Sequence, residues 1–288
     1  MLPQDFCGYN TELTDGVSSM KRLLLVVLCG AIFLEGIDIG MLNVALPSIR
    51  ADLGLETAEL SWVVGGYVLG YAGFMLLGGR AADLLGRRRM FLLWLAVFIA
   101  FSGLGGFATE SWMLILARFV TGVASAFMTP AGLSIITTAF PEGPRRDRVL
   151  MIYAATGAGG FSLGLVAGGV LASANWRLVF FAPVVLAALI LLGAIPLTPR
   201  DRRPEAGGRF DVLGAVTITA AMVLLALGVT RLEHGLGPVP LAAFAGGALS
   251  LAAFVAVERR AAHPLVRLAV LRNPGLLRAD LTAMLLAG

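Results

Sequence analysis

Eight apolar runs of about twenty residues, separated by short polar stretches, constrain this chain more than any other feature of its sequence. A helix of that length crosses the ~30 Å hydrocarbon core of a lipid bilayer. Hydrophobic residues make up 58% of the chain and charged residues 14%, which excludes an ordinary soluble domain. The sequence therefore predicts an all-α polytopic membrane protein. The expected membrane-spanning helices cover residues 23–46, 60–80, 90–108, 112–137, 149–172, 177–197, 212–231 and 238–257.

Basic residues alternate from loop to loop along the chain. They gather before the first run and after the second, fourth, sixth and eighth runs, at Lys21, Arg22, Arg87, Arg88, Arg89, Arg145, Arg146, Arg148, Arg200, Arg202, Arg203, Arg209, Arg259, Arg260, Arg267 and Arg272. The opposite loops contain Arg50, Arg177 and Arg231. Because cytoplasmic loops are enriched in Lys and Arg, we expect a multi-pass protein of the cell (plasma) membrane with a cytoplasmic N-terminus.

The polar breaks divide the chain into five expected parts. These are a disordered polar tail (1–20), an N-terminal six-helix transmembrane bundle (21–198), a cytoplasmic loop (199–211), a linker transmembrane helix pair (212–257), and a cytoplasmic loop with an incomplete ninth helix (258–288). The last apolar stretch, from Leu281 to Gly288, is too short to cross a bilayer. A fragment, a truncated gene and an interfacial segment all remain open, as does the true start at Met1 or Met20.

The first apolar run, from Leu23 to Ile49, contains two acids near its middle, Glu35 and Asp38. A charge at that depth costs at least ~2.5 kcal/mol on insertion scales, so it usually has a function. The two acids are three residues apart and therefore share one face of a helix. Either acid is also compatible with a purely structural hydrogen bond to a neighbouring helix.

Arg118 is an arginine well inside a predicted span. It lies about six residues, or ~9 Å, from the outer end of its helix. Asp38 lies ~8 Å from the outer side of a ~30 Å core by the same arithmetic, so the two depths agree. We expect Asp38 or Glu35 to pair with Arg118; the alternative is an arginine that extends to the outer interface.

A glycine- and arginine-rich stretch follows the second run. Gly86 permits a tight turn, and Asp83 can pair with Arg87 across one helical turn. The pattern formed by Gly79, Asp83, Gly86, Arg87 and Arg88 resembles the signature loop of the major facilitator superfamily, which acts there as a conformational switch.

Other segments resemble motifs of the same family. Leu114, Arg118, Thr121 and Gly122 resemble its second motif, although Thr121 stands where Gln is usual. Gly160, Gly164, Gly168 and Gly169 resemble its antiporter motif, with Leu165 in place of the usual Pro. Asp38, Asn43, Pro47 and Ile49 resemble the first-helix motif of the fourteen-helix drug:proton antiporter branch. Further matches to that branch are Asn175-Trp176-Arg177, Phe210-Asp211 and His263-Pro264-Leu265-Val266.

The resemblance implies the N-terminal half and linker helices of a secondary active transporter that works by alternating access. The implied activity is proton-coupled export of small amphipathic or cationic molecules such as drugs or antibiotics. Asp38, Glu35, Arg118 and Asn43 would serve proton coupling or substrate binding, and the four glycines from Gly160 to Gly169 would pack at the interface between bundles. The implied energy source is the proton gradient, with no cofactor. The expected partners are substrate, protons, lipid and a second transmembrane bundle, with no nucleic acid.

Two other classes of function compete with transport. An intramembrane aspartyl protease needs acids on two different spans, and only the first span contains any. A truncated, non-transporting remnant or membrane assembly protein remains the alternative, because alternating access needs two bundles.

The sequence predicts no metal site and no disulfide. His234 and His263 have no partners at metal-ligand spacing, and Cys7 and Cys29 are expected to be free thiols.

Overall fold

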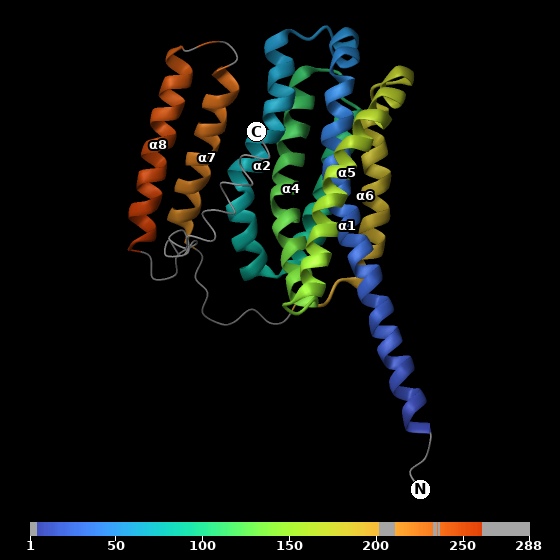
Figure 1. Cartoon of the computed structure of the whole chain (residues 1–288). Coiled ribbons are helices and arrows are strands. Elements are labelled where there is room, and N and C mark those ends of the chain that lie inside the picture. The colour runs from blue at the N-terminus through green and yellow to red at the C-terminus, as the bar shows by residue number, and fades with distance from the viewer. Residues whose placement is uncertain (1–4, 202–210, 233–234, 236, 261–288) are drawn as a thin grey trace. The chain divides into compact units, whose positions relative to one another are not determined.

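The computed structural model describes residues 5–201, 211–232, 235 and 237–260. Within these ranges the chain forms eight α-helices and no strand (Figure 1). The helices are α1 (Asp5–Leu53), α2 (Thr57–Leu85), α3 (Arg87–Gly106), α4 (Ser111–Ala139), α5 (Pro144–Ala174), α6 (Leu178–Leu197), α7 (Val212–Leu232) and α8 (Pro238–Glu258). All eight are long and apolar enough to cross a membrane, which confirms the predicted spans. The expected ninth helix lies outside the described residues.

The start of α1 differs from the sequence-based expectation. A disordered tail is predicted over residues 1–20, but α1 begins at Asp5, so this prediction does not hold for residues 5–20. Nucleating a helix is costly, whereas extending an existing one adds a hydrogen bond for each residue fixed. The long apolar helix that follows supplies the nucleus, and no proline interrupts the chain between Asp5 and the membrane span.

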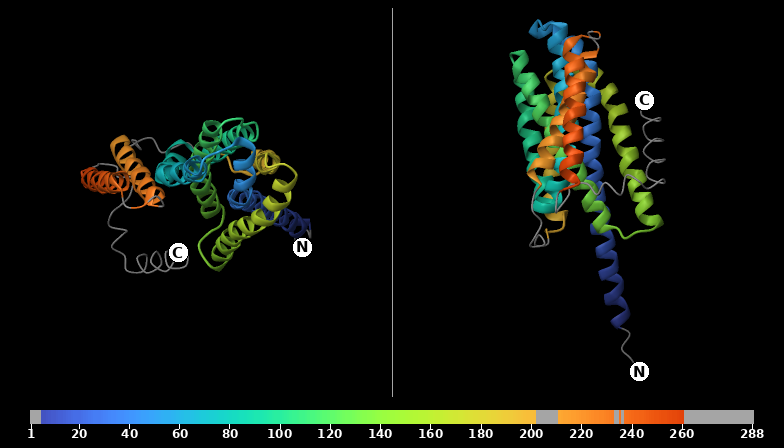
Figure 2. Two further views of the ribbon diagram at one scale, coloured as in Figure 1. Left: turned by 90° about the horizontal axis from the view of Figure 1, so that it is seen from above. Right: turned by 90° about the vertical axis from the view of Figure 1, so that its left-hand side faces the viewer.

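The chain separates into two compact units, residues 1–204 and 205–288. In the first unit α1 packs chiefly against α5, α2 against α4, and α3 against both α4 and α6 (Figure 2). The second unit contains α7 and α8, which pack against each other. Asp211 caps α7 locally, because its Oδ1 accepts a hydrogen bond from the backbone N–H of Gly214 at 2.9 Å.

Glycines allow the helices of the first unit to approach closely. A Cβ atom added to Gly164 would lie 2.6 Å from the carbonyl oxygen of Ile37, and one added to Gly168 would lie 2.6 Å from the Cα of Met41. Both neighbours are backbone atoms, which cannot move aside as a flexible side chain does. The contact between α5 and α1 therefore depends on small residues every fourth position, as in other helix pairs in membranes.

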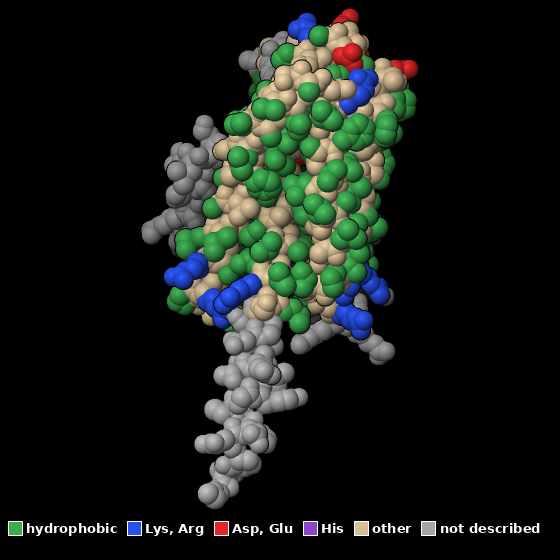
Figure 3. Space-filling view, turned by 90° about the vertical axis from the view of Figure 1, so that its right-hand side faces the viewer, with side chains coloured by type: hydrophobic (Ala, Val, Ile, Leu, Met, Phe, Trp, Pro, Cys, Tyr) green, Lys and Arg blue, Asp and Glu red, His purple; other side chains and the backbone are tan. Residues whose placement is uncertain are grey.

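The outer surface of the first unit matches a lipid environment. Figure 3 shows hydrophobic side chains covering the middle of one face, with Lys and Arg at its lower end and charged side chains of both signs at its upper end. Examples of exposed apolar residues are Val166 and Val170 on α5 and Leu192 on α6. The core beneath is built from large buried side chains, including Phe91, Phe98 and Leu95.

We predict that Gly164→Ala destabilises the bundle, whereas Gly159→Ala does not. A Cβ atom at position 159 meets no atom within 4 Å, so the control tests the same glycine-to-alanine change in open space. Overpacking should lower the free energy of unfolding of Gly164→Ala by ~1–3 kcal/mol. Gly159→Ala should instead raise it by up to ~1 kcal/mol, because alanine favours the helix more than glycine does. Unfolding of both variants in detergent micelles measures the difference. Equal stability of the two variants would show that α1 and α5 do not pack in this way.

Candidate functional site

An ion pair joins α1 to α4 in the core of the bundle. The Arg118 guanidinium donates through Nη1 to Oδ2 of Asp38 at 2.6 Å, and each residue is only 3% exposed. The Tyr67 ring of α2 lies 4.5 Å from the Arg118 Cζ, a distance at which the ring face attracts the cation. Three helices therefore meet at one charged pair.

Glu35 makes a different contact, although it lies one turn from Asp38 on the same helix. The Thr129 hydroxyl of α4 lies 2.8 and 2.7 Å from the two carboxylate oxygens of Glu35 and 2.9 Å from the carbonyl oxygen of Ser125. Glu35 is 5% exposed, and among the described residues it has no cationic partner within ion-pair distance. Of the two pairings expected from the sequence, the structure therefore contains the one between Asp38 and Arg118.

The packing of α1 sets the direction of both acids. Gly36 and Gly40 face the backbone of α5, where an added Cβ atom would lie 2.4 Å from the carbonyl oxygen of Gly157 or of Phe161, respectively. Because a helix turns by ~100° per residue, these glycines lie on the side of α1 opposite to Glu35 and Asp38. The α5 contact thus turns the acids towards α4. The sequence also contains this G-x-x-x-G spacing on α1, but the spacing alone does not identify the α5 glycines as its partner.

The remaining predicted residues of these helices are more dispersed. Asn43 is exposed, apart from the buried pair. Thr121 is buried and its hydroxyl donates to the carbonyl oxygen of Arg118 at 3.0 Å, one turn from the ion pair. Gly160 also lies against α1, whereas a Cβ atom at Gly169 would make only an ordinary 3.7 Å contact with Val44.

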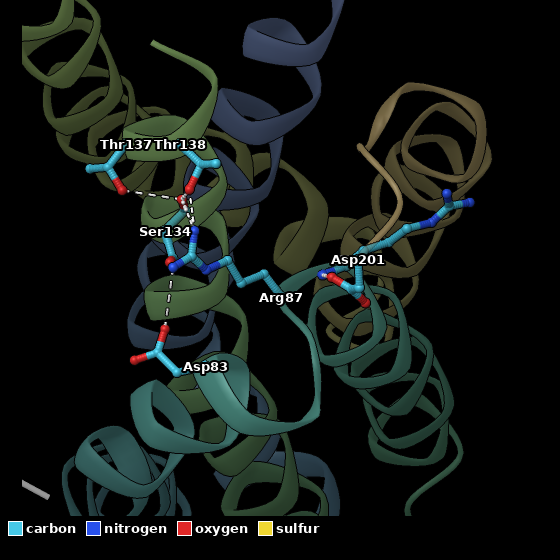
Figure 4. A network of polar contacts seen from close by, with 7 residues as sticks. Asp83, Arg87, Ser134, Thr137, Thr138 and Asp201 are labelled. Carbon is cyan, nitrogen blue, oxygen red and sulfur yellow. Dashed lines mark hydrogen bonds and ion pairs between the residues drawn. The ribbon is translucent and has the colours of Figure 1, made fainter. Parts of the chain in front are cut away.

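The signature loop, defined as residues 79–89, joins α2 to α3 and contacts α4. Arg87 donates to the carbonyl oxygen of Ser134 at 3.4 Å and to the Thr138 hydroxyl, and it lies 3.5 Å from Asp83 (Figure 4). Gly86 has a φ of +104°, a backbone conformation that favours glycine and that permits α3 to start immediately after α2. Gly79 lies within α2, where an added Cβ atom would make an ordinary 3.7 Å contact with Cβ of Pro130 on α4.

Arg88 of the same loop contacts α6 instead of α4. Its Nη2 donates to the carbonyl oxygen of Ile195 at 2.6 Å, and its backbone N–H donates to Asp201 at 2.9 Å. Sequence reasoning did not single out Asp201, which lies 113 positions away from Arg88. No local pattern links residues so far apart, so only the folded arrangement reveals this contact.

A second polar cluster lies at the other end of the bundle. Oδ2 of Asp52 accepts from Trp176 Nε1 at 2.8 Å and from Arg177 Nη1 at 2.9 Å. Arg177 also donates to the carbonyl oxygen of Ala108 at 3.2 Å and stacks on the Trp176 ring. This cluster ties the end of α1 to the segment between α5 and α6 and to the end of α3.

Among the described residues, no group of His, Cys, Asp and Glu side chains has the arrangement of a metal site. Cys29 is a buried free thiol. His234 and His263 lie outside the described residues. The chemistry available in the described core is therefore that of buried carboxyl groups, an arginine, and neighbouring hydroxyl groups.

Comparison with known proteins identifies relatives over most of the chain. The family model of the Major Facilitator Superfamily matches residues 28–285. The cephamycin export protein CmcT of Amycolatopsis lactamdurans is 45% identical over 277 aligned residues, and the match covers 94% of this chain and 57% of that protein. The lincomycin resistance protein of Streptomyces lincolnensis is 36% identical over 273 residues, covering 94% of this chain and 56% of that protein. The chain thus spans a little more than half the length of these relatives.

Solved structures show the same fold at lower sequence identity. The crystal structure of the POT family transporter PepTSo has a TM-score of 0.57 at 17% identity, covering 84% of this chain and 55% of that one. A bacterial homologue of the human lysosomal transporter Spinster, in an inward-facing and occupied conformation, has a TM-score of 0.53 at 23% identity, covering 85% of this chain and 63% of that one.

We predict energetic coupling between Asp38 and Arg118. Removing either charge alone, as in Asp38→Asn or Arg118→Gln, leaves its partner buried and unpaired, at an expected cost of ~3–5 kcal/mol. The double variant should lose less free energy of unfolding than the two single variants lose in sum, as measured by unfolding in mixed micelles.

The matched control is Glu142→Gln with Arg146→Gln. This pair lies 3.4 Å apart on the surface, with Glu142 93% exposed, so its coupling should be too small to measure. Strict additivity at Asp38 and Arg118 would contradict a buried ion pair.

Proposed function

We propose a function that follows from the family: the chain belongs to the Major Facilitator Superfamily, whose model matches residues 28–285. Members of this family are transporters, so the intramembrane protease alternative is dropped. The proposed activity is export of small molecules, such as antibiotics, by alternating access. The names of the cephamycin export and lincomycin resistance relatives support this choice of cargo. The chain would supply the six-helix N-terminal bundle and a linker pair.

The single observation that supports proton coupling is the buried contact between Asp38 and Arg118. Burial favours the neutral form of a carboxyl group, whereas an adjacent arginine favours the charged form. An acid whose arginine partner approaches and withdraws during a transport cycle therefore gains and loses a proton. We propose that Asp38 is this acid and that inward proton flow drives export.

Glu35 is the proposed contact for substrate. Its carboxyl group lies in the same core but interacts with the Thr129 hydroxyl instead of a cation. A cationic or amphipathic molecule that entered from the bundle interface would find an acid without a paired charge, in the same core as the Tyr67 ring that covers Arg118. Substrate and proton would then compete within one buried cluster.

The second bundle is also a proposal. Alternating access requires two bundles that move against each other around a central site. The described helices α2 and α5 expose apolar side chains, among them Met75, Leu76, Phe161 and Leu163, which suit either lipid or a second bundle. A non-transporting remnant or assembly protein is the alternative, because the chain spans 57% of the cephamycin exporter.

We predict that Asp38→Asn abolishes export driven by a pH gradient. The protein encoded by the complete reading frame is reconstituted in proteoliposomes, with cephamycin, lincomycin and ethidium as test substrates. The asparagine keeps the size of the side chain but can no longer carry a proton, so transport should stop responding to the gradient. Glu142→Gln, on the surface, is the control and should transport normally.

Unchanged gradient-driven transport in Asp38→Asn would remove Asp38 from the coupling step. A reading frame that ends at residue 288, together with no transport of any test substrate by the parent protein, would favour the remnant.

We predict a cytoplasmic N-terminus from the distribution of basic residues. Glu110 and Glu142 flank α4 at opposite ends. In a chain with Cys7 and Cys29 replaced by Ser, a membrane-impermeant maleimide added to intact cells should label Glu110→Cys and not Glu142→Cys. Permeabilised cells should show labelling at both positions. The reverse pattern in intact cells would invert the proposed topology.

A further inference from the structure

The first turn of α3 has unfavourable electrostatics. It contains Arg87, Arg88 and Arg89 and no acidic residue, although the N-terminus of a helix carries partial positive charge. Its N-cap residue is Gly86, which has no side chain to accept hydrogen bonds from the first backbone N–H groups. The start of α3 therefore lacks a side-chain cap of its own, and its three arginines repel the positive end of the helix dipole.

Asp201 supplies this cap from a distant part of the chain. Its Oδ1 accepts from the backbone N–H of Arg88 at 2.9 Å, and its Oδ2 accepts from that of Arg89 at 3.1 Å. Figure 4 shows Asp201 beside the start of α3, on the side away from the contact between Arg87 and α4. One carboxylate thus satisfies two free N–H groups and places a negative charge at the positive end of the helix.

The interaction between α3 and α6 is reciprocal. Arg88 donates through Nη2 to the carbonyl oxygen of Ile195 at 2.6 Å. Because α6 ends at Leu197, this carbonyl belongs to its last turn, where carbonyl groups lack helical N–H partners. The segment after α6 therefore caps the start of α3, while a side chain from α3 caps the end of α6.

The glycine of the signature loop leaves room for this arrangement. A Cβ atom built on Gly86 would lie 2.6 Å from Cγ of Asp201, so the carboxylate lies where any larger residue would place its side chain. Gly86 is consequently required twice, for its backbone conformation and for the space that Asp201 fills.

We propose that Asp201 is a positioning residue of the signature loop and that it sets the turnover rate of the transporter. The cap fixes the first turn of α3, and that turn directs Arg87 to α4 and Arg88 to α6. Without the carboxylate the first turn of α3 frays. Each conformational change of the transport cycle that involves the signature loop must then first reorder this turn. The turnover part of this proposal rests on the proposed function, whereas the capping part does not.

Turnover and substrate affinity should respond differently to loss of Asp201. The loop contacts α4 at Ser134, sixteen residues or ~24 Å along the helix from Arg118. A frayed loop at that distance leaves the ion pair and its surroundings in place. The maximal rate kcat therefore falls while KM stays constant, a separation that general misfolding of the bundle does not produce.

The capping part is tested by amide hydrogen exchange on the 288-residue chain in nanodiscs. Asp201→Ala should accelerate exchange at the amides of Arg88 and Arg89 by roughly 2- to 30-fold, the factor that corresponds to the ~0.5–2 kcal/mol of a helix N-cap. Asp201→Asn, which keeps one acceptor oxygen, should retain part of the protection. Asp211→Ala is the matched control, because Asp211 caps its own helix and its loss should expose only the amide of Gly214. Unchanged exchange at Arg88 and Arg89 in Asp201→Ala would overturn the proposal.

The turnover part is tested with the same variants of the complete protein in proteoliposomes. Asp201→Ala should lower kcat at constant KM, and Asp201→Asn should restore part of the rate. Faster amide exchange with unchanged kcat would overturn the positioning role. Absence of transport in the parent protein as well would overturn the proposed function and the turnover claim with it, while the exchange result still decides whether Asp201 caps α3.

Discussion

The low polarity of the membrane interior is the constraint on which this structure depends, because a charge placed there needs a partner. Asp38 and Arg118 meet this requirement for each other across α1 and α4, with each residue only 3% exposed. The pair is stable only if the two helices keep their rotation and depth. Glycine contacts between α1 and α5 and between α2 and α4 provide that restraint, since backbone atoms touch there directly. Tight apolar packing and the buried charge are therefore parts of one arrangement.

Polar clusters secure both ends of the same bundle. At one end Asp52 binds Trp176 and Arg177, which ties the end of α1 to the start of α6. At the other end the signature loop reaches α4 through Arg87 and α6 through Arg88 (Figure 4). Both ends of the described bundle are thus tied across helices, which is the restraint that the proposed alternating-access mechanism would require of one half of a transporter. The buried pair therefore lies between two polar clusters, one at each end of the bundle.

Much of the fold could be predicted because its signals are local. Apolar run lengths indicated eight spans, the arginine-rich loops indicated a topology, and simple depth arithmetic brought Asp38 to the level of Arg118. A hydrogen bond from one of the two acids to a neighbouring helix was among the alternatives, but its partner Thr129 could not be predicted, because the contact depends on the rotation of α1. The capping of α3 by Asp201 joins residues 113 positions apart. The helix over residues 5–20 was not predicted, because its polar composition is typical of a disordered tail, whereas extending the adjacent membrane-spanning helix costs little free energy.

Charge exchange between α1 and α4 tests the central claim most directly. Asp38→Arg and Arg118→Asp are introduced separately and together into the complete protein, and export driven by a pH gradient is measured in proteoliposomes. Each single variant places two like charges together in a buried site and should be inactive. The account predicts that the double variant, with opposite charges restored, recovers part of the activity. A double variant that folds and inserts as well as the parent yet remains as inactive as the single variants would contradict it.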